Sequence, residues 1–362
     1  MNKPVPPQSL RPDPDLPTCD LRRVGAHPDH WYPVAWSREL KRGGTLATAF
    51  AGEPIVLVRP RNGPVFALED RCAHRQVPLS KGTVDGCAVR CCYHGWAYNA
   101  DGRCTDVPYL GKDRLPNGVR AYPVREVGSL ILVFPGDPAL ADVTPLPGFA
   151  ALEDPAYKTR KFGRFVRCHY SFMHENLMDM NHQFMHSKQM GQMKPRVLGQ
   201  KREAGSIEVR YSFSRVGGKQ PLGEAVIFGE RRGADKALAE RDVMTVRTEY
   251  PYQTLRISTD GQPAVMDLWI CYTPQDKEQR TNRTFGLLSV RRPKVPFVID
   301  LLWPLLVAFT ERIFKEDRDI VELEQAAHDS QGCDLNQEVF PVIRSLRGLL
   351  AEEGVRLPQP AL

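Results

Sequence analysis

The sequence predicts an α+β fold, in which a small β domain is followed by a larger domain that combines an antiparallel sheet with helices. The first observation is that short β-rich runs alternate with Gly, Asn and Asp turns through the first third of the chain. The second is that later β-rich stretches lie between two helix-like segments, at residues 174–190 and 298–328. A chain of 362 residues is long enough to bury a core in each domain.

Composition divides the chain into four segments. Residues 1–18 are rich in proline and polar residues, which is typical of a mobile tail. We expect the small β domain at residues 19–135 and a proline-containing linker at 136–155. The larger α+β domain then covers residues 156–362.

The expected strands are runs of β-branched and aromatic residues bounded by turn residues. In the small β domain they are Ile55–Arg59, Val65–Glu69, Ala88–Cys92 and Leu130–Phe134. In the larger domain the β candidates fall within residues 207–273 and 284–290.

Composition and charge are those of an ordinary soluble protein, with 25% charged and 42% hydrophobic residues. The net charge of +6 is modest, and no nucleic-acid-binding motif accompanies it. Nine scattered cysteines form no disulfide framework and the amino terminus has no signal-peptide pattern, so the cytoplasm is the expected compartment. No G-x-G-x-x-G fingerprint indicates a built-in reductase.

One apolar stretch, Val295 to Phe309, needs comparison with a membrane span. It has only fifteen residues, and it contains Asp300 and two prolines. A helix that crosses a bilayer needs about twenty mostly apolar residues. We therefore expect a buried core helix here and no membrane span.

Two short runs, Cys72-Ala73-His74 and Cys91-Cys92-Tyr93-His94, each place one cysteine and one histidine at metal-ligand spacing. Two thiolates and two imidazoles suit an asymmetric [2Fe–2S] cluster, in which the cysteines bind one iron and the histidines bind the other. Neutral imidazoles in place of thiolates raise the reduction potential, which suits an electron relay. Structural zinc is the alternative, but zinc sites usually pair Cys with Cys and His with His.

A second group of metal-binding residue types consists of Asn176, Asp179, His182 and His186. Residues on a helix advance about 100° each, so Asp179 and the two histidines would fall within an arc of about 60°. Two histidines four residues apart can share one ion. This pattern is typical of a 2-His-1-carboxylate site, which leaves positions open on non-haem Fe(II) for oxygen chemistry. The alternative is a polar helix face with ordinary packing.

The carboxylate of such a site has three candidates. Asp179 shares the stripe with the histidines but is only one turn from His182, and Glu175 points the same way but lies about 10 Å along the axis from His182. Asp317 is the strongest candidate, because it interrupts an apolar stripe of a predicted helix, where an unpaired carboxylate is costly. Asp319 would point to the opposite side of that helix.

The two sites together resemble those in the oxygenase components of Rieske non-haem iron oxygenases, particularly the vanillate O-demethylase and dicamba monooxygenase type. The resemblance extends from His30-Trp31-Tyr32-Pro33 to Glu316-Asp317. The runs Asp70–Arg75 and Tyr93–Tyr98 closely resemble the two ligand loops of Rieske proteins. The resemblance implies a small β Rieske domain followed by a helix-grip-like catalytic domain.

The resemblance also implies roles for individual residues. The family's N-x-x-D-x-x-H stretch holds the first iron ligand, which matches His182, and its acidic pair near the carboxyl end supplies the carboxylate ligand, which matches Asp317. His186 would be the second histidine ligand. The family's bridging Asp, which connects the cluster of one subunit to the iron of its neighbour, matches Asp179. The family's Asn near the iron matches Asn176.

The implied function is that of a terminal oxygenase component, of the monooxygenase rather than the dioxygenase type. Electrons would come from NAD(P)H through a separate ferredoxin or flavin reductase and pass from the cluster to the Fe(II) of a neighbouring subunit in a homotrimer. O₂ activated there would hydroxylate, or oxidatively O- or N-demethylate, a small aromatic or hydrophobic substrate. The alternative is a Rieske electron-transfer protein fused to a ligand-binding domain without oxygenase activity.

Two features depart from the family's pattern. His182 and His186 are separated by three residues, whereas four are usual, and three suit an unbroken helix. Cys92 follows the second cluster cysteine, where proline is common, and we assign it no ligand role.

Overall fold

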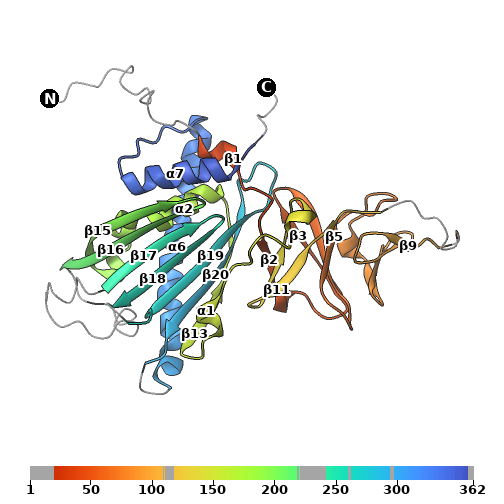
Figure 1. The fold of residues 1–362 in the computed structure, drawn as a ribbon, viewed down its shortest axis with the longest axis horizontal. Helices are drawn as coiled ribbons and strands as arrows, with labels where there is room; N and C mark the ends of the chain where they lie inside the picture. Colours follow the sequence, from red (N-terminus) through yellow and green to blue (C-terminus); the bar gives the residue numbers. More distant parts are fainter. Residues whose placement is uncertain are drawn as a thin grey trace.

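Figure 1 shows the computed structural model of the chain. The structure describes residues 20–108, 110, 118–217, 220, 242–259, 262–293 and 297–357. The tail expected at residues 1–18 lies outside the described residues.

The amino-terminal part is built from short antiparallel strands, as the sequence predicts. They form three sheets, of order β10-β5-β4-β3, β11-β12-β2 and β6-β7-β8-β9. The strands are β2 (Tyr32–Trp36), β3 (Gly44–Phe50), β4 (Glu53–Arg59), β5 (Phe66–Glu69), β6 (Thr83–Asp85), β7 (Ala88–Arg90), β8 (Ala97–Tyr98), β9 (Cys104–Asp106), β10 (Ala121–Tyr122), β11 (Val124–Val127) and β12 (Leu130–Val133). Strands β4, β5, β7 and β12 confirm the four expected strands, and β7 ends early because a turn begins at Cys91.

The carboxyl-terminal part is dominated by one antiparallel sheet, of order β13-β20-β19-β18-β17-β16-β15, with β14 also paired to β20. Its strands are β13 (Tyr157–Phe162), β14 (Phe165–Val166), β15 (Gln192–Glu203), β16 (Ser206–Gly217), β17 (Asp242–Glu249), β18 (Tyr252–Thr259), β19 (Met266–Pro274) and β20 (Asn282–Arg291). Every neighbouring pair is antiparallel, which confirms the expected sheet type.

Helices cover one face of this sheet. Figure 1 shows α6 running behind the sheet, and α2 contacts β17 and β19 as well as α6 and α7. The helices are α1 (Ala150–Glu153), α2 (Tyr170–Met178), α3 (Ser187–Met190), α6 (Val298–Gln331) and α7 (Pro341–Glu353), with 3₁₀ turns η2 (Leu21–Arg23), η3 (Ser37–Glu39), η4 (Leu79–Lys81), η5 (Pro138–Leu140) and η6 (Met180–Phe184). A two-residue strand near each end, β1 (Val24–Gly25) and β21 (Val355–Arg356), pairs the two ends of the described chain.

The helix expected at residues 174–190 is not continuous, which corrects the prediction. Helix α2 ends at Met178, and Asp179 takes an extended conformation (φ −86°, ψ 94°) before η6 and α3 follow. The cause is local: the Asp179 carboxylate accepts a hydrogen bond from the backbone N–H of Asn181 at 2.9 Å and so caps a new turn. Asp side chains commonly compete with a helix in this way.

The helix expected at residues 298–328 is present as α6, which has 34 residues. Ile299 and Leu306 are buried, but Leu301 is 82% exposed. The expectation of a buried core helix between Val295 and Phe309 is therefore wrong for one face. Apart from Asp300 the stretch is apolar around the helix, whereas only one side of a helix can meet the sheet. Among the described residues, no helix is both long and apolar enough to cross a membrane.

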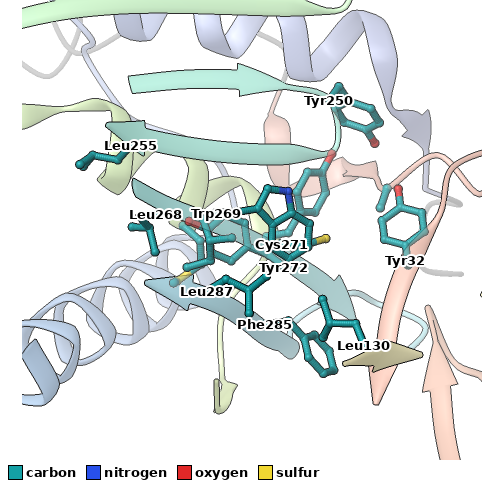
Figure 2. Packing of buried hydrophobic residues seen from close by; sticks show 14 of the residues in the cluster. Tyr32, Leu130, Tyr250, Leu255, Leu268, Trp269, Cys271, Tyr272, Phe285 and Leu287 are labelled. Atoms are coloured by element: carbon teal, nitrogen blue, oxygen red, sulfur yellow. The ribbon is translucent and has the colours of Figure 1, made fainter. Parts of the chain in front are cut away.

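One hydrophobic core joins the two parts of the chain (Figure 2). Tyr32 from β2 belongs to the same buried cluster as Cys271 and Phe285 from the large sheet. The Tyr252 hydroxyl donates a hydrogen bond to the carbonyl of Trp31 at 2.6 Å across this junction. Packing in this shared core therefore fixes the orientation of β2 and β12 relative to the large sheet, whereas the small sheet β6–β9 packs in a second hydrophobic cluster.

Candidate metal centres

The first candidate site lies on two turns next to the small sheet β6–β9. One turn follows β5 and carries Cys72 and His74, and the other connects β7 to β8 and carries Cys91 and His94. The two cysteines are buried, whereas the two imidazoles are exposed and their ring centroids lie 4.5 Å apart. Buried cysteines and exposed imidazoles would place the thiolate-bound iron of an asymmetric cluster inside the protein and the imidazole-bound iron at its surface.

The two turns have the same backbone hydrogen bonds. The amide of Cys72 donates to the carbonyl five residues later at 2.9 Å, and that of Cys91 does the same at 2.8 Å. Each cysteine carbonyl accepts from the amide four residues later, which belongs to Gln76 or Gly95. Both of these residues have positive φ, 60° and 73°. The two ligand loops are thus two copies of one turn.

Tyr98 connects the first turn to strand β8. Its hydroxyl accepts the amide hydrogen of Ala73 at 3.1 Å and lies 3.2 Å from the Cys72 sulfur. Burial raises the pKa of Tyr98, so the hydroxyl stays protonated and has its own hydrogen to donate to the sulfur. Trp96 stacks on His74, with ring centroids 4.8 Å apart. No sequence pattern indicates this role of Tyr98, because only the register of β8 places it against the turn.

The second candidate site brings together three residues singled out in the sequence. His182 lies on η6, His186 caps α3 and Asp317 lies near the middle of α6. Their ligand atoms lie within 4.8 Å of one another. Nε2 of His186 is 3.1 Å, and Nε2 of His182 is 3.7 Å, from Oδ1 of Asp317. Two ligands bound at about 2 Å to one ion are about 3 Å apart, so this donor set fits a single non-haem iron.

Each histidine is held by a hydrogen bond from its other ring nitrogen. Nδ1 of His182 donates to the backbone carbonyl of Asp179, and Nδ1 of His186 donates to the Glu316 carboxylate at 2.7 Å. Gln189 donates to the other oxygen of Glu316 at 2.6 Å. Protons fixed on Nδ1 leave both Nε2 atoms free to bind a metal. No sequence pattern indicates these roles of Glu316 and Gln189, because only the fold brings them to His186.

The remaining predicted residues lie around this site. The Asn176 side chain donates to Oδ1 of Asp317 at 3.1 Å. The carboxylate of Asp179 is half-buried and accepts from both nitrogens of Asn181, at 2.9 and 2.8 Å. Asp319 is exposed and pairs with a lysine one turn away, so α6 presents Asp317 to the site and Asp319 to solvent, as predicted.

An apolar pocket opens onto the second site. Asp317 and Asn176 line it, and its empty volume is about 660 Å³, including the part open to solvent. Its apolar walls include Phe162, Val166, Met173, Leu268, Ile270 and Phe314. The exposed Arg164 and the half-buried Glu311 also line it, and these two side chains form an ion pair at its rim. Small-molecule sites have this character, with apolar walls and a few polar groups.

Comparison with known protein families matches both parts of the chain. The Rieske [2Fe-2S] domain family matches residues 30–123, and the family of the vanillate O-demethylase oxygenase C-terminal domain matches residues 166–342. The 4beta-methylsterol monooxygenase of Methylococcus capsulatus is 33% identical over 359 residues, which cover 94% of this chain and 92% of that protein. The dicamba O-demethylase oxygenase component of Stenotrophomonas maltophilia is 39% identical over 43% of this chain and 46% of its own.

The fold agrees with these relatives. The crystal structure of dicamba monooxygenase bound to dicamba has a TM-score of 0.69 at 23% identity, over 92% of this chain and 97% of that chain. Such a match shows the α+β fold of a Rieske domain followed by a catalytic domain. The sequence relatives are oxygenase components of multicomponent systems, so a reductase or ferredoxin supplies the electrons. The chain belongs to the Rieske non-haem iron oxygenases, and it is a terminal oxygenase component that uses a [2Fe–2S] cluster and a mononuclear iron.

Proposed function

We propose that Cys72, Cys91, His74 and His94 hold the [2Fe–2S] cluster. The support is the matched pair of turns, with the sulfurs buried and the imidazoles exposed. The two imidazoles are then the outlet for electrons, because they reach the surface where another protein group can contact them.

His182, His186 and Asp317 bind the mononuclear iron in this proposal. The observation that carries it is that their three ligand atoms converge where an apolar pocket ends. Asn176 orients the carboxylate. The bound iron supplies oxygen activation, while the chain's own groups orient the ligands and keep bulk water away with apolar walls.

In the proposed homotrimer, electrons cross from the cluster of one subunit to the mononuclear iron of the next. Figure 1 places the small sheet β6–β9 at the opposite end of the molecule from α2. Tyr93, beside the cluster histidine His94, is exposed, and Phe184, beside His182, is 88% exposed. A head-to-tail ring would cover both side chains, because it sets the cluster turns of one subunit against η6 of the next. Asp179 then relays the electron between subunits.

The proposed substrate is a lipophilic, methyl-bearing molecule of the sterol class. The support is the apolar pocket and the methylsterol monooxygenase, which matches nearly the whole chain. The reaction is R–CH₃ + O₂ + 2e⁻ + 2H⁺ → R–CH₂OH + H₂O, with both electrons from NAD(P)H through the reductase. One oxygen atom forms the new C–O bond, and the other leaves as water. On a carbon attached to O or N, the hydroxylated product would instead lose formaldehyde.

The proposed domain boundaries and compartment follow the sequence analysis. The Rieske domain takes residues 19–135, the linker 136–155 and the catalytic domain 156–362, and the matched ranges 30–123 and 166–342 fall inside the two domains. Among the described residues, the cysteines other than the proposed cluster ligands Cys72 and Cys91 are free thiols, which a reducing cytoplasm would maintain.

Substrate screening tests the substrate class. With a surrogate reductase, we expect kcat/KM for a 4-methylsterol to exceed that for a methoxybenzoate by about tenfold or more, because the apolar walls give each added hydrocarbon group a contact. The readout is product formed per O₂ consumed. A preference for the methoxybenzoate would assign the pocket to aromatic acids instead.

Replacing the proposed carboxylate ligand tests the iron site. Asp317→Ala should lower the iron content from about three to about two atoms per chain, because one ligand of the mononuclear site is lost while the cluster is untouched. Metal analysis and the visible spectrum of the cluster are the measurements. Asp319→Ala is the matched control and should keep about three iron atoms per chain. Full iron retention in Asp317→Ala would place the ligand elsewhere.

The Glu316 carboxylate is expected to position His186. Glu316→Gln should weaken iron binding about 10- to 100-fold, as is typical when a hydrogen-bond partner of a metal-bound histidine is lost. Iron titration of protein depleted of the mononuclear iron alone measures this, and the cluster spectrum should be unchanged. Glu322→Gln, on the same helix but bonded to Arg167, is the control. Equal affinity in the two variants would refute the positioning role.

The hydrogen bond from Tyr98 should raise the reduction potential of the cluster. Tyr98→Phe removes one neutral hydrogen bond, which contributes about 0.5–1.5 kcal/mol, so the potential should fall by roughly 20–60 mV. A spectroscopic redox titration measures the shift. An unchanged potential would mean that the hydroxyl does not donate to the sulfur.

A further inference from the structure

The start of α6 carries an exposed apolar face, which consists of Val298, Leu301 and Leu305 together with Phe297, the residue that precedes the helix. Phe297 and Leu301 are 80% and 82% exposed, and Leu305 is 45% exposed. At about 100° per residue, the three helical side chains fall within an arc of about 60°, on the side of the helix away from buried Leu306. A contiguous apolar patch of this kind marks an interaction surface.

This apolar face leads to the rim of the pocket. Glu311 and Phe314 of the same helix line the pocket, and Glu311 follows Leu305 by six residues, which is about 9 Å along the helix. Figure 1 shows the beginning of α6 beside β13, and Lys158 of that strand contacts Asp300 of α6. A partner that docks on the apolar face therefore also lies next to the opening of the pocket.

Positive charge is in excess around the apolar face. Lys158 and Arg292 both pair with Asp300, at 2.5 and 3.1 Å. Arg164 is exposed and pairs with Glu311, which also pairs with the buried Arg160. Each carboxylate thus balances only one of its two cations. Anionic phosphate headgroups complement such an excess, by about 1 kcal/mol for each basic residue near the surface.

We propose that the apolar face of α6 docks on the surface of an anionic lipid bilayer, with Phe297, Leu301 and Leu305 among the acyl chains. The inference rests on the proposed lipophilic substrate, which would pass from the lipid into the pocket without crossing water. A basic helix end with an apolar face is typical of interfacial helices. A second copy docked by a two-fold axis would instead bring the basic rims of both chains together, and like charges repel.

Vesicle binding by the intact holoenzyme tests the proposal. The probes are vesicles of phosphatidylcholine with and without phosphatidylglycerol, and the readout is the fraction of protein that floats with them. We expect binding to the phosphatidylglycerol vesicles that weakens in high salt. The double variant Leu301→Ser/Leu305→Ser should bind at least about tenfold more weakly. The control is Leu323→Ser, a 64% exposed leucine near the other end of α6, which should bind normally.

Three results would overturn the proposal. They are no binding by the unchanged protein, equal binding by the double variant, and a change in oligomeric mass in the double variant, which would make the face a contact between copies. Turnover of a detergent-dispersed substrate separates this proposal from the proposed function. Normal turnover by the double variant with weaker vesicle binding supports docking, whereas vesicle binding without turnover of any lipophilic substrate would refute the substrate class alone.

Discussion

A single carboxylate, Asp317, ties the long helix α6 to the broken segment that follows α2. It accepts a hydrogen bond from Asn176 of α2 and faces the Nε2 atoms of His182 and His186. A half-buried carboxylate between two imidazoles is stabilised best by a cation that all three can share. The register of α6 across the sheet is therefore set by chemistry as well as by packing, since a shift of one residue would turn Asp317 away from the histidines.

The proposed ligands could be picked out from the sequence because metal chemistry restricts both residue type and spacing. Helix periodicity alone distinguished Asp317 from Asp319, and in α6 Asp317 faces His186 whereas Asp319 pairs with a lysine at the surface. Periodicity failed at Asp179, where one side-chain hydrogen bond ended the helix. The rings of His182 and His186 still lie 5.2 Å apart, because η6 ends at Phe184 and the αR residue Met185 leads directly to His186.

Other parts of the site could not be predicted, because they depend on contacts between distant elements. The hydrogen bond from His186 to Glu316 joins α3 to α6, and Tyr98 reaches Cys72 only because β8 packs under the turn. The exposure of Leu301 could not be predicted either, because it depends on which side of α6 packs against the sheet. An apolar helix sequence indicates that its faces avoid water, but not which face the sheet covers.

The repeated turn around the cluster has a consequence for how the cluster is lost. With the proposed ligands, the turn of Cys72 and the turn of Cys91 each supply one sulfur and one nitrogen, so each turn binds both irons. Neither iron can leave by opening one turn alone, because its other ligand is on the opposite turn. Because each iron has one ligand on each turn, the cluster should be lost as a unit rather than one iron at a time.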